Sequence, residues 1–283
     1  MARPDLDVTF ATRVARLVGR RPIRAGSLIV TLYGDAILPR GGVLGLAALT
    51  ALVEPFGLNS GQIRTALSRL VADGWFVRTR DGRASFYALA PARVAEFRTA
   101  AERIYAPVGP RRSLGFEQLV LTAADPADRA RLRERLAREG YGALAPNVLL
   151  RAADGLSDRG DPAPSGTVRA SIGEIGGDPA DLRAMAAAAW LLRRLAGDYR
   201  ALIADFRPLA AATVDATAAA DRAAFAARVL LVHEFRRLVL RDPHLPDALL
   251  PVDWPGGVAR ELCARLYLAV LPASEAWLGG IAA

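Results

Sequence analysis

The sequence of 283 residues contains no lysine, one cysteine and two histidines. The single Cys263 has no second cysteine to pair with, and its place in an apolar pattern predicts a buried, reduced thiol. Neither His233 nor His244 has a cysteine at metal-ligand spacing, so we expect no metal site. No apolar run approaches about 18 residues, and acids and arginines stand where a signal peptide would be apolar. These absences predict a cytoplasmic protein.

Motifs that cradle phosphates or carry nucleophiles are also missing. The chain has no Walker loop, no Gly-x-Gly-x-x-Gly sequence after a predicted strand and no Gly-x-Ser-x-Gly elbow. We therefore expect no cofactor and no enzymatic activity. One enzymatic alternative stays open, a metal-dependent nuclease that would use Asp125, although Asp125 also stands where a helix needs an N-cap.

Positive charge is present, and it is unevenly distributed. All 37 basic residues are arginines, and the net charge is +8. Residues 1–105 contain 15 arginines and eight acids, whereas the rest of the chain contains 22 arginines and 21 acids. This distribution favours a polyanion, such as nucleic acid, as the partner of the first third.

The pattern of apolar residues predicts an α+β fold of three units, of which the first spans residues 24–105. Helices are expected over 25–38 and 43–57, with a third in the opening stretch, before the helix that follows Ser60. Residues 75–80 and 85–90 alternate as strands do, and Asp81-Gly82 between them is a hairpin signal. Helices followed by a hairpin form a winged helix-turn-helix, and a linking helix ends at Pro107.

The second predicted unit spans residues 111–177, and the third spans residues 178–283. The second has the order strand, helix, strand, strand that is typical of a small ferredoxin-like module, with strands expected over 113–124, 141–152 and 167–176 and a polar loop over 153–166. The third has long amphipathic patterns that predict a mainly helical domain, with Trp254 as a packing anchor at a turn.

The helix that follows Ser60 has one apolar face and one polar face. The second helix of a helix-turn-helix lies in the major groove of DNA, where arginine recognises guanine, glutamine recognises adenine, and serine or threonine contacts bases or phosphates. The polar face therefore predicts contacts with DNA through Gln62, Arg64, Thr65, Ser68 and Arg69.

The predicted hairpin is also basic. Arg78, Arg80 and Arg83 flank the Asp81-Gly82 turn, so this wing is expected to place positive charge on the adjacent DNA backbone or groove. The alternative is that helix and wing are solvated faces of a protein-interaction module, since winged helices also bind proteins. The agreement of helix, hairpin and local charge favours DNA.

Several segments resemble the PaaX family, the family of the phenylacetic acid degradation repressor. In the first unit these are "SLIVTLYGD", "PRGG", "PFGLNSGQIRTALSRLVADGW" and "RDGRASFYAL"; later ones are "LRERLAREGYGALAPNVLL" and "LLVHEFRRLVLRDPHLPDALLPVDWPG". The resemblance implies a dimeric transcriptional regulator, usually a repressor of a catabolic operon, with a winged-helix reader and a C-terminal effector and dimerisation region. The inducer of its best-known members is phenylacetyl-CoA.

One departure from the family bears on the effector. Family members commonly have a Trp-rich segment at the start of the middle domain, where this chain has "RRSLGFEQLVL" with Phe116 as the only aromatic residue. An anionic effector needs cationic partners, and Arg236 and Arg237 follow His233 in "LLVHEFRR". These three residues are the candidate effector site. The alternatives are a structural histidine and surface ion pairs of the arginines with Glu234 or Asp242.

Together, these features predict a homodimeric repressor that binds an inverted-repeat operator in double-stranded DNA. Its effector is expected to be a small molecule, such as phenylacetyl-CoA or another aryl- or acyl-CoA thioester. A sequence-independent architectural DNA-binding protein remains a second class, and the nuclease a third. A purely electrostatic binder has little use for the large remainder of the chain, which is almost neutral.

Overall fold

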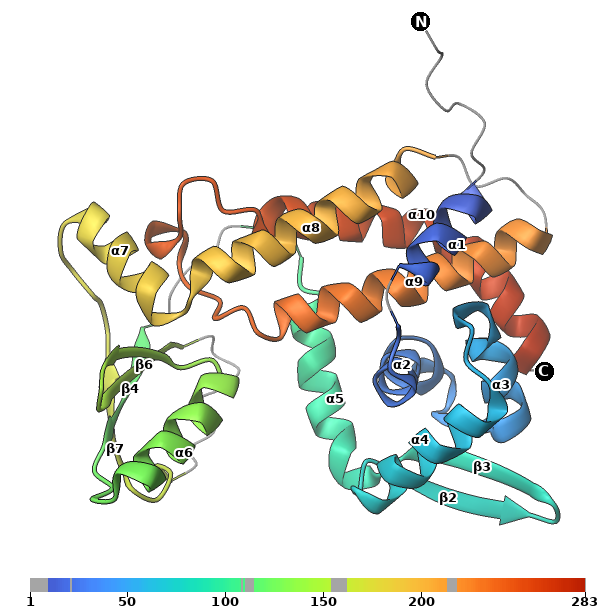
Figure 1. Ribbon diagram of the computed structural model, residues 1–283, viewed down its shortest axis with the longest axis horizontal. Helices are drawn as coiled ribbons and strands as arrows, with labels where there is room; N and C mark the ends of the chain where they lie inside the picture. Colours follow the sequence, from blue (N-terminus) through green and yellow to red (C-terminus); the bar gives the residue numbers. More distant parts are fainter. Residues whose placement is uncertain are drawn as a thin grey trace, which may run out of the picture. The chain divides into compact units, whose positions relative to one another are not determined.

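The computed structural model describes residues 10–20, 22–107, 109, 115–153, 162–212 and 218–282 (Figure 1). Over these residues the protein is α+β, with helices and two antiparallel sheets. The chain divides into two compact units: Met1–Ala106, Leu202–Arg236 and Arg260–Ala283 form the first, and Pro107–Ala201 and Arg237–Ala259 form the second. The predicted start of the middle unit at Arg111 and the centre of the polar loop, 154–161, lie outside the described residues.

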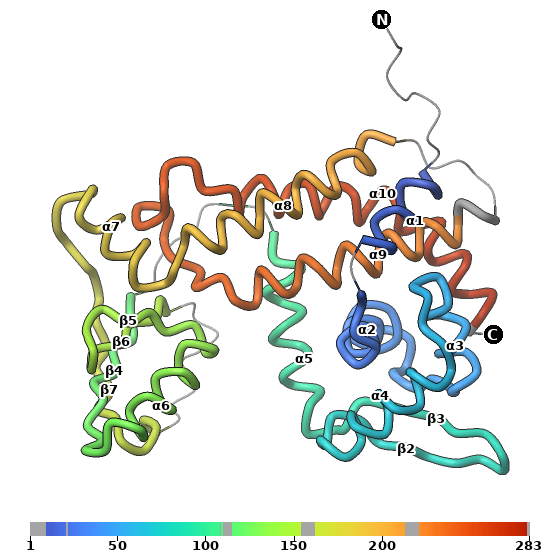
Figure 2. Tube along the Cα trace, viewed as in Figure 1, coloured from blue at the N-terminus to red at the C-terminus, as the bar shows by residue number. Residues whose placement is uncertain are grey.

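The N-terminal part of the first unit consists of five helices and a three-stranded sheet. The helices are α1 (Phe10–Gly19), α2 (Ala25–Leu32), α3 (Leu46–Val53), α4 (Ser60–Ala72) and α5 (Pro91–Ile104), and the strands are β1 (Val43–Gly45), β2 (Phe76–Asp81) and β3 (Ala84–Leu89). The strand order is β1-β3-β2. In Figure 2 the trace of α2 is seen nearly end-on, with α3, α4 and α5 around it. Leu28, Leu49 and Leu67 are among the fully buried residues of this core.

Two of the predicted helices differ from the observed ones. The helix expected from Val43 begins at Leu46, because Val43–Gly45 pairs with β3 as a short strand instead. The helix expected over 25–38 leaves regular α geometry after Leu32 and continues as a π-helical turn, η1 (Tyr33–Ile37), and a 3-10 turn, η2 (Leu38–Arg40). A second 3-10 turn, η3 (Glu54–Phe56), ends α3. Irregular helical turns of this kind often accompany functional positions.

The hairpin is formed one residue later than predicted. Asp81 still pairs with Ala84, so the two loop residues are Gly82 and Arg83. Gly82 has a φ of +54°, whereas Arg83 is not among the residues with positive φ. Glycine first and an ordinary residue second is the pattern of a type II′ turn, whose twist matches that of paired strands. Glycine is required at this position, which explains the shift.

Three long helices complete the first unit and extend into the second. They are α8 (Leu192–Ala210), α9 (Ala218–Val239) and α10 (Gly256–Ala282). Within the first unit, α9 is buried almost continuously from Ala223 to His233, and its Phe225 ring lies 4.5 Å from the Trp277 ring of α10. The C-terminal helices therefore share a hydrophobic core in this unit.

The second unit contains a four-stranded antiparallel sheet. Its elements are β4 (Phe116–Leu121), α6 (Pro126–Arg138), β5 (Gly142–Ala145), β6 (Val148–Ala152), β7 (Thr167–Ile172), α7 (Pro179–Ala189) and the 3-10 turn η4 (Asp247–Leu249). The strand order is β5-β6-β4-β7. The single strand predicted over 141–152 is a hairpin of β5 and β6 with an irregularity between Ala143 and Ala145.

Two side chains of the second unit have the positions expected from the sequence. Asp125 caps α6, since its carboxylate accepts a hydrogen bond from the amide of Ala127 at 3.0 Å. Trp254 packs against a core cluster that includes Phe116 and Leu250, and its ring meets that of Tyr199 edge-on at 5.8 Å.

Candidate DNA-binding surface

Helix α4 begins at a complete capping box. The Asn59 side chain accepts a hydrogen bond from the Gln62 amide, and the Gln62 side chain accepts one from the Asn59 amide, both at 2.9 Å. Two amides that have no partner within the helix are thereby satisfied. Ile63 and Leu67 are fully buried and attach the helix to its unit. The opposite face is therefore held in a defined orientation toward solvent.

All five side chains predicted to contact DNA lie on that exposed face: Gln62, Arg64, Thr65, Ser68 and Arg69. Arg64 folds back toward the start of α4, where its Nη2 donates to the Ser60 hydroxyl at 3.2 Å. Thr65 donates to the Gly61 carbonyl at 3.0 Å. Among the described residues, the side chains of Ser68 and Arg69 have no hydrogen-bond partner.

Gln62 has less freedom than the sequence suggests. Its side-chain carbonyl is occupied by the Asn59 amide, whereas recognition of adenine by glutamine uses the carbonyl and the amino group together. In this conformation one of the two lone pairs of the Gln62 carbonyl is engaged, and the amino group is available to a base.

The hairpin extends the exposed positive charge. Arg78 and Arg80 are two residues apart on β2, and they face Tyr87 and Ser85 of β3 respectively. Arg78 Nη2 donates to the Ser85 hydroxyl at 2.6 Å, while Arg80 and Arg83 are exposed and have no side-chain partner in the part of the chain that is described. In Figure 1, α4 and the β2–β3 hairpin lie together along the lower edge of the first unit.

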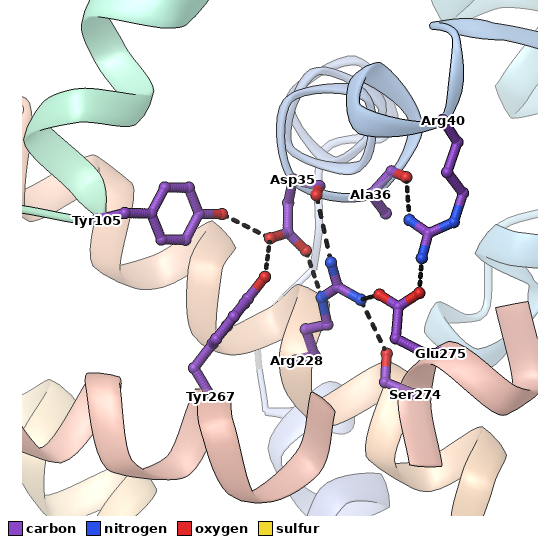
Figure 3. A network of polar contacts seen from close by, with 8 residues as sticks. All are labelled: Asp35, Ala36, Arg40, Tyr105, Arg228, Tyr267, Ser274 and Glu275. Carbon is purple, nitrogen blue, oxygen red and sulfur yellow. Dashed lines mark hydrogen bonds and ion pairs between the residues drawn. The ribbon is translucent and has the colours of Figure 1, made fainter. Parts of the chain in front are cut away.

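The first unit also contains a buried polar cluster that the sequence does not predict (Figure 3). The Asp35 carboxylate, on the π-helical turn, accepts hydrogen bonds from Arg228 Nε at 2.8 Å, Tyr105 Oη at 2.5 Å and Tyr267 Oη at 3.0 Å. Arg228, with 2% of its surface exposed, also donates to Glu275 at 2.5 Å. The cluster joins η1, the end of α5, α9 and α10.

The two tyrosines remain hydrogen-bond donors at neutral pH. Burial, together with the nearby Asp35 charge, raises the pKa of Tyr267 to about 12 and raises the pKa of Tyr105 as well. Their hydroxyls therefore keep the protons that they share with the Asp35 carboxylate. Only the charged residue types at positions 35 and 228, each inside an apolar pattern, could have signalled this cluster.

The three residues predicted to bind the effector have different environments. His233 is buried, with its Nδ1 2.9 Å from the Thr31 hydroxyl. Arg236 Nε donates to the same hydroxyl at 2.7 Å, and its Nη2 donates to the Ser27 carbonyl and hydroxyl at 3.0 Å. Arg237 is exposed. The structure thus brings His233 and Arg236 together at α2 and leaves Arg237 on the surface.

An apolar cavity of about 280 Å³ lies in the first unit. Residues from the end of α5 and from α9 and α10 line it, and they include Tyr105, Phe235, Arg260, Cys263 and Tyr267. None of the three predicted effector residues is among the lining residues. Within the described residues, no cluster of histidine, cysteine and acids could hold a metal ion, and no helix is long and apolar enough to cross a membrane.

An exposed cationic helix start beside a cationic hairpin is a surface suited to a polyanion. Comparisons with known proteins identify the family. Two protein-family models match the chain. The family described as PaaX-like protein matches residues 24–92, and the one described as PaaX-like protein C-terminal domain matches residues 190–280. The transcriptional repressor PaaX of Escherichia coli (strain K12) is 34% identical to this chain, over 94% of the chain and 87% of the relative. The chain therefore belongs to the PaaX-like family.

A solved structure is also similar. It is that of the uncharacterized protein Rv0674 from Mycobacterium tuberculosis, with a TM-score of 0.55 and 25% identity, over 89% of this chain and 98% of that one. The match extends the similarity across both units of the fold.

Proposed function

We propose that this protein is a DNA-binding transcriptional repressor that recognises its operator through α4 and the β2–β3 hairpin. Membership of a family that includes a named transcriptional repressor supports this class, and it is a class of regulators and not of enzymes. The observation that carries the proposed site is the exposed face of α4, where Arg69 and Ser68 have no side-chain partner in the described chain.

The order of elements supports a winged helix-turn-helix. Helix α3 is followed by α4 and then by the hairpin of β2 and β3, with β1 pairing to β3. In such a module the second helix of the pair enters the major groove, and the hairpin lies against the adjacent backbone. In the second unit, the strand order β5-β6-β4-β7 with α6 after the first strand supports a ferredoxin-like module within residues 111–177.

Direct base recognition is assigned to the exposed face of α4. In this proposal Arg64, Thr65, Ser68 and Arg69 would contact base edges, and Arg78, Arg80 and Arg83 would contact phosphates. The amino group of Gln62 would add one further contact. Because phosphate contacts carry no sequence information, specificity depends on the helix and affinity at low salt depends strongly on the hairpin.

The operator and the effector complete the proposal. A homodimer, with residues 178–283 as its effector and dimerisation region, would match an inverted-repeat operator by two-fold symmetry. An aryl- or acyl-CoA thioester, phenylacetyl-CoA being the member of this class implied by the family resemblance, would release the repressor by binding one of its states more tightly. Regulation of phenylacetate catabolism in the cytoplasm follows from the same resemblance.

Binding to DNA tests the proposed function. The full-length protein is mixed at about 150 mM salt with the intergenic DNA upstream of its own gene or with scrambled DNA, with and without phenylacetyl-CoA and related thioesters. Preference for the intergenic DNA, relieved by one thioester, is expected. Equal affinity for the two DNAs would instead favour an architectural protein, and cleavage of DNA that requires Mg²⁺ would favour a nuclease.

A further inference from the structure

The cavity of the first unit has the dimensions and lining of a small-molecule site. Ligand sites are mostly apolar concavities with a few polar groups at fixed positions. A cavity of about 150 Å³ accommodates benzene, and this one measures about 280 Å³. It therefore has room for an aromatic ring with a short substituent.

The lining favours an aromatic ring over a straight chain. Tyr105 and Tyr267 both line the cavity, with their ring centroids 5.6 Å apart and their planes inclined by 58°. Phe235 lines it too, and the Arg260 guanidinium lies 5.5 Å from the centre of the Phe235 ring. These three aromatic side chains offer a further ring the edge and offset contacts that aromatic groups prefer.

The polar group in the wall is also fixed in place. Arg260 is 8% exposed, and its Nη1 donates to the carbonyls of Arg103 at 3.1 Å and of Ala106 at 3.3 Å. This positively charged group beside the apolar space suits a ligand whose ring bears a polar or anionic substituent. It also connects the N-terminal part of α10 to the end of α5.

We propose that this cavity binds the aromatic ring of the effector, and that Tyr105 and Tyr267 transmit its occupancy to Asp35. The inference rests on the proposed repressor function, and it assigns the effector ring to residues other than His233, Arg236 and Arg237. Each of the two tyrosines has its ring in the cavity wall and its hydroxyl on the Asp35 carboxylate.

Asp35 connects the cavity to the DNA-binding region. It lies in η1, directly after α2, and α2 packs against α4. A ligand that displaces either tyrosine ring changes the hydrogen bonds that hold the π-helical turn, and it then acts on the position of α4. Coupling requires that the ligand bind the two arrangements with different affinity.

The rate at which Cys263 is modified reports whether the cavity is occupied, because Cys263 is the single cysteine of the chain and lines the cavity. Burial raises the pKa of its thiol to about 12, so its modification by methyl methanethiosulfonate is followed by mass spectrometry at a pH of about 9. The probe is 2-phenylethanol, which has one ring and a short polar substituent. When the concentration of 2-phenylethanol is about ten times its dissociation constant, we expect the modification of Cys263 to be about tenfold slower. We expect 1-hexanol to slow the modification much less.

Two variants of α10 test whether the probe occupies this cavity. Ala264 lines the cavity and is exposed, so Ala264→Phe should fill it without crowding the core, and should abolish protection of Cys263 by 2-phenylethanol. Ala269→Phe is the matched control, since Ala269 is exposed on the same helix and is not a lining residue. Protection that survives in Ala264→Phe, or equal loss in both variants, would overturn the proposed site.

Tyr267→Phe separates binding from transmission. The substitution keeps the ring in the wall and removes the hydroxyl from Asp35, so 2-phenylethanol should still protect Cys263. In the unchanged protein the probe should alter the affinity for operator DNA, and in Tyr267→Phe this response should be lost. A response of the same size in both proteins would overturn the coupling.

The outcomes distinguish this inference from the function on which it rests. If 2-phenylethanol does not protect Cys263 while operator binding is intact, the cavity proposal is wrong and the proposed repressor function is retained. If Cys263 is protected but operator and scrambled DNA bind equally, the ligand site stands and the proposed function is wrong. Equal protection by 1-hexanol would overturn the assignment to an aromatic ring.

Discussion

Arg228 and Arg69 carry the same charged group in opposite environments. Arg228 is 2% exposed and donates to Asp35 and Glu275, whereas the Arg69 side chain is exposed and has no hydrogen-bond partner among the described residues. A buried guanidinium must be paired, because an isolated buried charge is very unfavourable. An exposed one remains hydrated and available to a phosphate or base. The same residue type is thus structural in the interior and available for binding on α4.

The comparison also separates the two consequences of losing an arginine. Removal of a buried partner leaves the opposite charge without compensation, so the expected effect is on folding. Removal of an exposed, unpaired side chain leaves the fold intact, so the expected effect is on the affinity for the ligand.

The largest effect is expected for Arg228→Ala. It leaves the Asp35 carboxylate buried without its ion-pair partner, and we expect the free energy of unfolding to fall by about 3 to 5 kcal/mol. Urea denaturation followed by circular dichroism measures the change. The control is Arg222→Ala on the same helix, where the exposed ion pair with Glu54 should be worth at most about 1 kcal/mol. Similar losses in the two variants would contradict the structural role of the buried cluster.

Arg69→Ala should act on DNA binding and not on stability. If Arg69 contacts a base, operator affinity falls by about 1 to 3 kcal/mol and discrimination between operator sequences is relaxed. Arg64→Ala is expected to behave likewise. Fluorescence anisotropy with operator and scrambled DNA measures both quantities, and Arg98→Ala, an exposed arginine of α5, is the control. Uniform weakening on all DNAs would identify a phosphate contact instead.

Loss of the helix cap should lower the free energy of unfolding by an intermediate amount. Asn59→Ala removes the acceptor of the Gln62 amide, and such substitutions cost roughly 0.5 to 2 kcal/mol of unfolding free energy. Thermal unfolding measures it, with Ser68→Ala on the exposed face of the same helix as the control. A cap that contributes nothing would show that α4 is held by packing of Ile63 and Leu67 alone.

The smallest effect is expected for the hairpin. Arg80→Gln or Arg83→Gln should weaken binding to every DNA sequence to the same degree and reduce the slope of log affinity against log salt by about 1 for each phosphate that is no longer neutralised. Titrations at several salt concentrations measure the slope. An unchanged slope with altered sequence preference would mean that the hairpin contacts bases, which would end the proposed division between helix and wing.

Much of the local structure could be predicted from the sequence. The helix after Ser60 and the hairpin follow from the spacing of apolar residues and from the turn residues. Asp125 is expected as a cap because its side chain can satisfy amides that have no partner within the helix. The expected helix from Val43 is partly wrong, since Val43 and Leu44 pair with β3, and a β-branched residue such as Val43 suits a strand. The single strand expected over 141–152 is wrong, because Pro146 and Asn147, both common in turns, separate β5 from β6.

The position of the positive charge and the face of α4 that carries it follow from the sequence, because charge distribution and helical period are local properties. Which charges are paired depends on packing between distant segments. Asp35 and Arg228 are 193 positions apart in the sequence, and their ion pair exists because α9 packs beside the π-helical turn. The cavity, too, depends on three helices distant in sequence, since its walls are set by packing and not by any local pattern.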